Sequence, residues 1–563
     1  MNPKLRRVLD AVRARWPLFA AAAFGLFVFL AQGGAAAINP VDTRWIPAGK
    51  DWGYHWVGWL YFRAAPWSLP LGDTPNLLWP VGTTVGFMDG LPWLSTILKL
   101  FAPVLPQNFQ WVGPYIGLTF VLQGWFGARL VSALTPSRPT AAIGGGLYAI
   151  APVLLNRIRH MALCSHFIIL AALTTVVRRE ERARLAPVLL PAVTMGIHPY
   201  LTFVVLGISL AAILRYRIEG LCTTIGALVR LAIMLALVAG VAALFGFFMH
   251  GGTEVAGRGF GFFNSDLLSL VNAQGMSSVL PVVPQRQGQG EGFGFLGAGV
   301  IVLGLAAIVV EIRARLRGER PLPWRRVAPL IVIAILYIIF SWGSKISVFG
   351  HDVLDVSWLY PAYTGSIFRA SGRFIWIMTY TLTTGAIAIW AIRLPRLAPF
   401  VLAAVLVFQF VDSKGVFFSK RFGGPRRAPV QSADWQLAAG DYDKMILFPP
   451  RCGDGGGVCC EGFTPPPHDE DMYLAVLAVR LGLSYNGFGA GRVARSKHAV
   501  YCKAVKDEVL GGHLDARSIY VVARDREAAF RKANPTAPCR KLDAELVCVA
   551  PAATGSFRDK LGR

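Results

Sequence analysis

The stretch CTTIGALVRLAIMLALVAGVAALFGFF, residues 222–248, decides the fold class, because Arg230 is its only charged residue. About 20 consecutive apolar residues are enough to carry a helix across the hydrocarbon core of a bilayer. Lipid solvates every face of such a helix, whereas water would force all of its faces to be buried. The stretch therefore predicts a transmembrane helix.

Similar apolar runs recur along the chain, which has 563 residues, 54% of them hydrophobic and only 16% charged. Soluble domains carry about 25% charged residues, so this shortage of charge itself indicates a membrane protein. We predict about 11 spanning helices, near residues 17–38, 110–133, 139–156, 160–178, 185–198, 199–215, 222–248, 294–313, 327–346, 373–393 and 396–412. The runs 185–198 and 199–215 are short, and we interpret them as a hairpin that does not fully cross.

The formal net charge of +24 would indicate nucleic acid in a soluble protein, but here the arginines gather in loops between spans. Cytoplasmic loops are enriched in Lys and Arg, so we assign to the cytoplasm the loops that contain Arg138, Arg178, Arg179, Arg182, Arg184, Arg215, Arg217, Arg313, Arg315, Arg317, Arg320, Arg325, Arg326, Arg393 and Arg396. This predicts a multi-pass membrane protein with a cytoplasmic N-terminus and no nucleic-acid partner.

Two segments bear on this orientation. Residues 17–38 follow a basic start and end near GGAAA, so a cleaved signal peptide is one interpretation. The run is long for that, which favours a retained first helix. If the apolar stretch 91–106 crossed the membrane, every later loop would be assigned to the opposite side. We therefore expect this stretch to lie flat in the interface.

The chain is predicted to have two domains. Residues 1–412 form an all-α polytopic membrane module with outer loops at 39–109, 249–293 and 347–372. In residues 413–563, strand-like runs such as KMILFPP and SIYVVAR alternate with helix-like stretches such as REAAFRKA. This alternation predicts a soluble α/β domain, and the orientation places it in the periplasm.

The cysteines support an oxidising compartment for that domain. Six of them follow the last apolar run, namely Cys452, Cys459, Cys460, Cys502, Cys539 and Cys548. Such a cluster predicts disulfides, with a zinc site as the alternative. The connectivity cannot be derived from the sequence, although Cys539 and Cys548 flank what looks like a hairpin and are our expected pair.

Candidate catalytic residues lie in the first outer loop. Asp51 and His55 share a face if GKDWGYHWVGWLYFR, residues 49–63, is helical. A carboxylate oriented by an imidazole can act as a general base, whereas the simpler interpretation is a helix cap. Asp89, in GFMDGLP, either faces the same cavity or caps the flat helix that follows.

Candidate anion-binding residues lie in later segments. These segments are at the outer ends of predicted spans, where the positive-inside rule leads us to expect few arginines. Arg157 and His160 lie three positions apart in PVLLNRIRHMALCSHF and would project together. Arg369 and Arg373 lie in SIFRASGRFIW, and Gly372 between them would let a backbone or a lipid headgroup approach closely. Guanidinium groups bind phosphate bidentately, whereas anchoring at lipid headgroups is the alternative. Further polar candidates are a buried histidine and four residues of the loop 249–293, of which we would test Glu291 first: His166, Glu254, Asn264, Asp266 and Glu291.

These motifs, together with LLWPVGTTVGFMDGLPWLSTILK, LPQNFQWVG, GEGFGFLGAG and YNGFGAGR, resemble the GT-C superfamily of membrane glycosyltransferases, and within it an uncharacterised bacterial membrane family. The resemblance implies a catalytic acid in the first outer loop, which is Asp51 here. It also implies a polyprenyl-phosphate-linked sugar as donor and a glycan, lipid or protein as acceptor. The paired-acid motif is absent because Trp52 and Gly53 follow Asp51, so a divalent metal stays an open question and we assign no metal ligands.

Two other classes compete with this interpretation. The sequence has no P-loop and no GxGxxG, which argues against a nucleotide-driven cytosolic enzyme. A lipid-linked saccharide transporter would instead place charges near the membrane midplane and show inverted repeats. A non-catalytic polysaccharide assembly protein would tolerate the loss of the Asp51 carboxylate.

Overall fold

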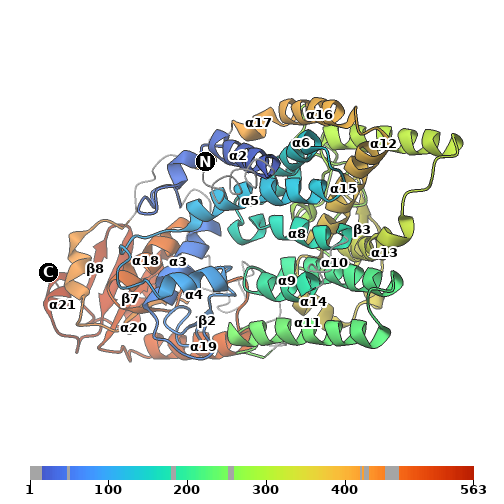
Figure 1. Ribbon diagram of the computed structural model, residues 1–563. Coiled ribbons are helices and arrows are strands. Elements are labelled where there is room, and N and C mark those ends of the chain that lie inside the picture. Colours follow the sequence, from blue (N-terminus) through green and yellow to red (C-terminus); the bar gives the residue numbers. More distant parts are fainter. Residues whose placement is uncertain are drawn as a thin grey trace, which may run out of the picture. The chain divides into compact units, whose positions relative to one another are not determined.

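The computed structural model describes residues 15–46, 51–178, 185–251, 259–418, 421–423, 430–450 and 468–562 (Figure 1). Contacts divide the chain into two compact units. The first unit comprises Met1–Asn39, Val112–Val241 and Gly259–Gly423, and the second comprises Pro40–Trp111, Ala242–Arg258 and Gly424–Arg563. Several residues named above lie outside the described residues, namely Arg179, Arg182, Arg184, Glu254, Cys452, Cys459 and Cys460.

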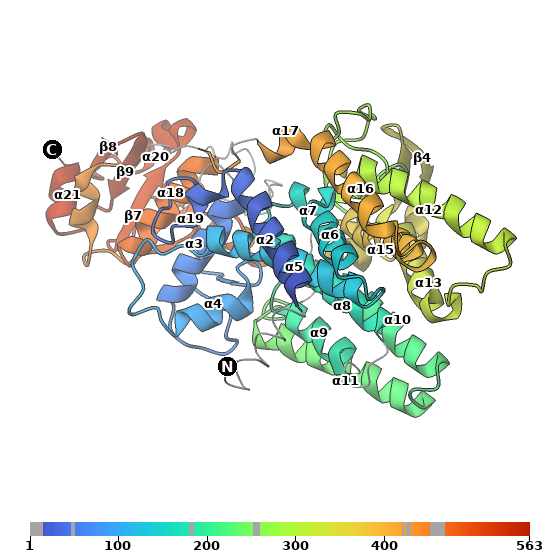
Figure 2. The ribbon, with the colours of Figure 1, turned by 45° about the horizontal axis from the view of Figure 1, so that its top comes forward.

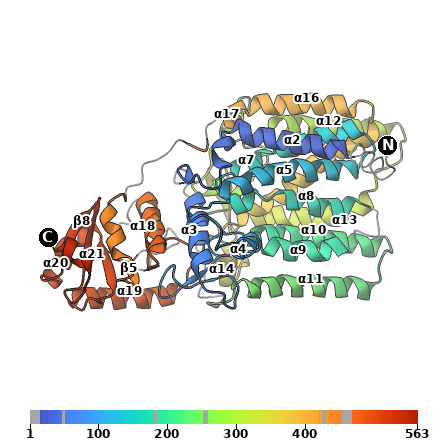
Figure 3. The same cartoon turned by 60° about the vertical axis from the view of Figure 1, so that its left-hand side comes forward.

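The first unit is a helical bundle, and its long helices run nearly along one direction in Figure 3. The helices of the bundle are α2 (Trp16–Ala31), α5 (Val112–Ser132), α6 (Arg138–Ala149), α7 (Pro152–Asn156), α8 (Phe167–Val177), α9 (Ala186–Met195), α10 (Pro199–Ile218), α11 (Thr224–Leu244), α12 (Ala298–Leu316), α13 (Trp324–Ser341), α15 (Trp376–Arg393) and α16 (Ala398–Asp412). Short elements connect them, including η3 (Met161–Cys164), η5 (Gln289–Gly292), β3 (Lys345–Val348), β4 (His351–Asp355), α14 (Ala362–Ile367), η7 (Ser371–Ile375) and α17 (Lys414–Phe417).

Every predicted apolar run contains a helix, and among the described residues five helices are long and apolar enough to cross a membrane. These are Arg138–Asn156, Pro199–Ile218, Thr224–Leu244, Trp324–Ser341 and Ser371–Arg393. The predicted number of about 11 crossings is therefore confirmed only in part. Helix α9 has 10 residues, which is about 15 Å and shorter than the hydrocarbon core, whereas α10 has 20 residues and is long enough to cross. The predicted hairpin that does not fully cross is therefore wrong for the run 199–215.

The helices differ in how much apolar surface they bury. In α11 only 11% of the most apolar 18-residue stretch is buried, whereas in Arg138–Asn156 the buried share of such a stretch is 72%. The exposed face of α11, with Ile225 and Leu228, is therefore the surface expected to meet lipid. Inside the bundle α2, α5 and α6 lie side by side (Figure 2). A Cβ at Gly124 of α5 would lie 2.0 Å from the carbonyl oxygen of Ala21, so only glycine allows this close approach.

The second unit combines the predicted first outer loop with the carboxy-terminal domain. The loop contributes α3 (Asp51–Ala64), β1 (Asp73–Thr74), β2 (Thr83–Thr84) and α4 (Pro92–Lys99). The domain contributes β5 (Lys444–Phe448), α18 (His468–Arg480), β6 (Ser484–Tyr485), α19 (Arg495–Leu510), β7 (Ser518–Val522), α20 (Glu527–Ala533), β8 (Cys539–Leu542), β9 (Glu545–Val549) and α21 (Ser556–Leu561). Helix α4 has only eight residues, so the stretch 91–106 does not supply a spanning helix.

The carboxy-terminal sheet has the strand order β6-β5-β7-β9-β8. Strand β5 is parallel to β6 and β7, whereas β9 runs antiparallel to β7 and β8. The first three strands need helical crossovers, which α18 and α19 provide, while β8 and β9 form a hairpin. The predicted α/β domain is thus confirmed.

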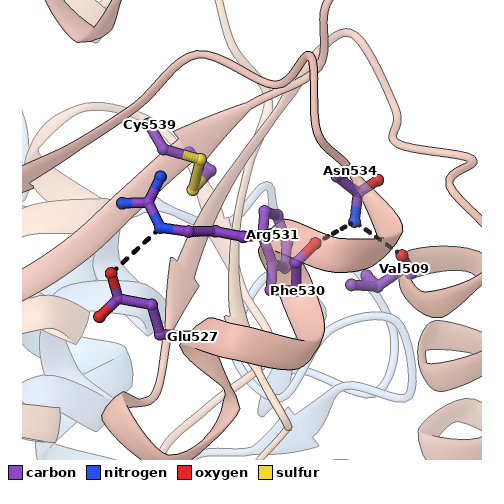
Figure 4. Close-up of a disulfide and its surroundings, with 7 residues drawn as sticks. Val509, Glu527, Phe530, Arg531, Asn534 and Cys539 are labelled. Atoms are coloured by element: carbon purple, nitrogen blue, oxygen red, sulfur yellow. Dashed lines mark hydrogen bonds and ion pairs between the residues drawn. A yellow bond between two sulfur atoms is a disulfide. The ribbon is translucent and has the colours of Figure 1, made fainter.

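A disulfide joins Cys539 to Cys548 across the β8–β9 hairpin, as expected from the sequence. Figure 4 shows this disulfide beside α20, where Arg531 pairs with Glu527. The amide of Asn534 donates hydrogen bonds to the carbonyl oxygens of Val509 and Phe530. These contacts fix α20 on the domain.

The predicted loop 39–109 extends this sheet. The amide of Tyr485 donates to the carbonyl oxygen of Asn76 over 2.8 Å, and the amide of Trp79 donates to that of Tyr485 over 3.0 Å. Leu77 thereby forms a parallel bridge with Tyr485 at the β6 edge. Helix α3 packs on α18, where the Tyr61 hydroxyl donates to the carbonyl oxygen of Ala475. Contacts therefore group this loop with the carboxy-terminal domain.

Candidate functional site

Three of the predicted site residues meet in the first unit, and we call Arg157, Glu291 and Arg373 the Glu291 cluster. Arg157 follows α7, Glu291 lies in η5 and Arg373 lies in η7. Both guanidinium groups bind the same oxygen, Oε2 of Glu291, at 2.8 Å for Nη1 of Arg157 and 2.9 Å for Nε of Arg373. The structure thus joins segments that are far apart in the sequence.

The two arginines of the Glu291 cluster are buried, with exposures of 4% for Arg157 and 6% for Arg373. Arg157 also donates to the carbonyl oxygens of Gly290 and Glu291, each over 2.8 Å. Aromatic rings complete the surroundings, because Arg157 lies 5.4 Å from the ring of Trp376 and Arg373 lies 4.6 Å from that of Tyr200. A desolvated guanidinium is stabilised by such ring faces.

The carboxylate of Glu291 stays ionised in this setting. Burial would raise its pKa, but the charges of Arg157, Arg373 and His160 outweigh burial and hold the pKa well below its ordinary value. His160 immediately precedes η3, three residues after Arg157. The side chain of Glu291 is 24% exposed, so the cluster is accessible from outside the protein.

Gly372 explains why η7 can lie on η5. A Cβ at Gly372 would come within 2.5 Å of Cα of Gly292 and 2.7 Å of the carbonyl carbon of Asn264. The Gly372 amide also donates to the carbonyl oxygen of Phe263 over 3.0 Å. The sequence predicted a close approach at this glycine, and a backbone fills that space.

Arg369 differs from Arg373, although the sequence predicted that they would act as a pair. Arg369 is half-buried and lies 5.2 Å from the ring of Phe263. It makes no ion pair within the part of the chain that the structure describes, whereas Arg373 is bound to Glu291. The charge of Arg369 is therefore not balanced by an acid among the described residues and can serve a ligand.

The other polar candidates of the first unit have structural partners. His166 is fully buried, with Nδ1 2.9 Å from the Tyr380 hydroxyl. The amide of Asn264 donates to the carbonyl oxygens of Trp342 and Lys345, each over 2.6 Å. Asp266 accepts a hydrogen bond from the amide of Leu268 over 2.7 Å. These residues shape the loops around the cluster.

The second unit holds the predicted catalytic residues. Asp51 is the first residue of α3 and is partly exposed. His55, one turn later, is 1% exposed, and its Nδ1 lies 3.2 Å from the carbonyl oxygen of Met88. Burial lowers the pKa of His55 to about 4, so the imidazole is neutral at pH 7. His55 thereby fixes the turn that carries Asp89.

Sequence reasoning did not find the aromatic and backbone partners of these groups. Tyr200, Phe263 and Trp376 contact the arginines, and Met88 contacts His55. Trp376 and Met88 stood inside quoted motifs, but nothing in a single sequence pointed to their contacts, and Tyr200 and Phe263 carry no signal there. Asp51 and Asp89 belong to the second unit and the Glu291 cluster to the first, so their convergence stays a prediction.

The comparisons with known proteins place the chain in a family. Residues 22–414 match the family described as "Domain of unknown function (DUF6311)", and residues 434–550 match the "DUF6311 C-terminal domain". The chain belongs to this family. This match confirms the expected likeness to an uncharacterised family.

No curated protein matches the chain. A solved structure of ArnT from Cupriavidus metallidurans bound to undecaprenyl phosphate is similar, with 12% sequence identity and a TM-score of 0.43. The similarity covers 94% of this chain and 98% of that chain. A similarity at this level does not establish a shared fold. Within the described ranges, no three His, Cys, Asp or Glu side chains are arranged to hold a metal ion.

Proposed function

We propose that this protein is a membrane glycosyltransferase that moves a sugar from a polyprenyl-phosphate donor to a cell-envelope acceptor. The reaction takes place at the outer face of the bacterial inner membrane, where the predicted topology also puts the carboxy-terminal domain. The observation that carries the proposal is the Glu291 cluster together with Arg369. It sets buried and partly accessible guanidinium groups at the ends of apolar helices, where a lipid-linked phosphate would lie.

The charge balance of this region favours an anion. Glu291 neutralises one of its two arginine partners, so the cluster keeps an excess positive charge. Arg369 adds a cation without an ion pair among the described residues, and the backbone places it four residues before Arg373. A phosphate monoester or diester accepts several charge-assisted hydrogen bonds from such groups. The polyprenyl chain would extend along the apolar helix faces.

The proposed reaction is a single inverting displacement. Asp51 accepts the proton of the acceptor hydroxyl, whose oxygen then forms a bond to the anomeric carbon of the donor sugar. The bond between that carbon and the phosphate oxygen breaks, and polyprenyl phosphate leaves with the electron pair. Arg369 and Arg373 offset the charge that develops on the leaving group. Asp89 contributes to the same site, and neutral His55 holds the turn that carries it.

The test uses the full chain in vesicles that contain undecaprenyl phosphate glucose as probe, with envelope glycan extract as acceptor. Asp51→Asn should lower the release of undecaprenyl phosphate by about 100-fold to 10,000-fold, as expected for loss of a general base. Asp42→Asn is the control, because Asp42 lies in the same predicted loop but pairs with Arg44 at the surface. Unchanged release with Asp51→Asn would support the non-catalytic alternative.

A transporter is the second candidate function, and the same vesicles distinguish it. A lipid-linked saccharide transporter leaves the bond between sugar and phosphate intact. Movement of the labelled lipid between leaflets without release of undecaprenyl phosphate would therefore replace the transferase proposal with a flippase.

A further inference from the structure

The loop that follows β6, residues 486–491, touches both segments that carry the predicted catalytic acids. The amide of Gly491 donates to the carbonyl oxygen of Phe87 over 2.7 Å, two residues before Asp89. The ring of Phe488 lies 4.8 Å from that of Tyr54 on the first turn of α3, which begins at Asp51. All of these residues belong to the second unit. The loop thus spans from one acid-bearing segment to the other.

The backbone is in an unfavourable conformation on both sides of this contact. Phe488 has a φ of 89°, and Asp89 and Leu91 each have a φ of 50°. Residues with a Cβ rarely adopt this left-handed region, because the Cβ crowds the neighbouring carbonyl group. Non-glycine residues keep such angles where the surrounding structure fixes them, and they cluster at functional sites. Phe488 and Leu91 are each 1% exposed, so packing holds both.

The loop is anchored firmly to the carboxy-terminal sheet. The side-chain amide of Asn486 bonds both backbone groups of Leu447 in β5, accepting over 2.7 Å and donating over 3.1 Å. The Tyr485 hydroxyl donates to Asp471 of α18 over 2.7 Å. From the opposite side His55 contacts the carbonyl oxygen of Met88. The turn 87–89 is therefore held between α3 and the carboxy-terminal domain.

We propose that the carboxy-terminal domain is a built-in part of the active site, in which Phe488 and Gly491 are positioning residues for Asp51 and Asp89. The domain is then not a separable module that only collects the acceptor. This inference rests on the proposed function. Phe488 acts through Tyr54 on the start of α3, and Gly491 acts through Phe87 on the turn with Asp89.

The test measures full-length Phe488→Ala in the vesicle assay described above, with Phe488→Leu as the variant that restores packing volume. Phe488→Ala should lower kcat by roughly 10-fold to 100-fold, because misplacing a catalytic group strongly slows the reaction. Phe488→Leu should recover most of this loss, and binding of undecaprenyl phosphate should not change. Amide hydrogen exchange at 86–91 should become faster in Phe488→Ala.

The matched control is Phe557→Ala, which removes a fully buried ring of the same domain that packs on Trp435. It should lower the melting temperature and leave kcat and exchange at 86–91 unchanged. An unchanged kcat in Phe488→Ala, or an equal loss in Phe557→Ala, would overturn the positioning role. If Phe488→Ala does not fold, Phe488→Val takes its place with the same measurements, and a wild-type kcat with unchanged exchange at 86–91 in that variant would overturn the positioning role. Full activity of Asp51→Asn would instead refute the proposed function itself.

Discussion

Among the described residues of the first unit, three glutamates each bind two arginines, namely Glu291, Glu219 and Glu311, and the first two lie near opposite ends of α10. In what we call the Glu219 cluster, Glu219 accepts from Nε of Arg215 over 2.9 Å and from Nε of Arg326 over 2.6 Å. Arg215 lies near the end of α10, whereas Tyr200, which contacts Arg373, lies at its start. Helix α10 has 20 residues and is about 30 Å long, which matches the hydrocarbon core.

The difference between the two clusters indicates which end binds a ligand. Arg215 also donates to the carbonyl oxygens of Val176 and Arg178, so it closes the end of α8. Around Glu291 both arginines lie beside aromatic rings and next to Arg369, which has no ion pair among the described residues. Around Glu219, Arg215 lies 5.8 Å from the ring of Tyr216, and Arg326 is 22% exposed. We therefore interpret the Glu219 cluster as structural and the Glu291 cluster as the anion site. The predictions below test this assignment, from the largest effect to the smallest.

Removing the carboxylate at the centre of either cluster should destabilise the protein, and the loss of stability should be larger for Glu291 than for Glu219. Glu291→Gln leaves two buried guanidinium groups without a counter-charge, which costs about 3–5 kcal/mol. Glu219→Gln should cost less, because Arg326 is 22% exposed. The thermal unfolding of both purified variants checks this. An equal or larger loss in Glu219→Gln would contradict the account of how the Glu291 cluster is buried.

Mild acid should act on His55 and leave both clusters charged. Native His55 binds its proton only below about pH 4, whereas the unfolded chain binds it near the ordinary value of 6.5. Stability should therefore fall between pH 6.5 and 4, by at most about 3 kcal/mol from this group. The neighbouring arginines hold the pKa of Glu291 and that of Glu219 below the ordinary value of 4.5 against the effect of burial, so their contributions persist to lower pH.

Thermal unfolding of His55→Asn at a series of pH values measures how much of the pH-dependent loss of stability is due to His55. The variant keeps an amide that can donate to Met88 and should show a shallower loss between pH 6.5 and 4. A pH dependence identical to that of the wild type would show that His55 is not buried as a neutral group.

Replacing glycine by alanine should destabilise the protein where the glycine is crowded and should not where the space beside it is open. Gly372→Ala forces η7 away from η5 and should cost about 1–3 kcal/mol through overpacking. Gly385→Ala is the control in α15, where a Cβ meets nothing within 4 Å. It should be neutral or slightly stabilising, because alanine favours the helix. Equal melting temperatures would contradict the close contact between Gly372 and Gly292.

Arg369, which has no ion pair in the described part of the chain, should contribute to binding of the lipid phosphate. Arg369→Ala should weaken the affinity for undecaprenyl phosphate about 10-fold, a loss of about 1.4 kcal/mol. Added salt should reduce the difference between variant and wild type, since screening weakens partly exposed charges. Arg325→Ala, an exposed arginine beside the Glu219 cluster, should bind as the wild type does. If the two substitutions weakened the affinity for undecaprenyl phosphate equally, the Glu291 cluster could not be distinguished from the Glu219 cluster as the anion site.

The sequence was sufficient where the signal is local. Apolar length predicted the helices, and strand alternation with two flanking cysteines predicted the β8–β9 hairpin and its disulfide. Gly372 between two arginines also indicated a close approach before any partner was visible. In each of these cases the responsible residues are neighbours along the chain, so periodicity and spacing carry the information.

The sequence was insufficient where partners are distant. Arg157 and Glu291 are 134 positions apart, and Leu77 pairs with Tyr485 through backbone groups that every residue possesses. One sequence cannot show which distant arginine meets which acid. It therefore suggested Arg369 and Arg373 as a pair, whereas Arg373 is bound to Glu291 and Arg369 is not. It also gave no sign that the loop 39–109 joins the carboxy-terminal sheet.

The most direct test is an experimental density map of the full chain with undecaprenyl phosphate. The account predicts headgroup density within hydrogen-bonding distance of Arg369 and Arg373, with room beside it for a sugar that reaches Asp51. Headgroup density at Arg215 and Arg326, or at neither cluster, would contradict it.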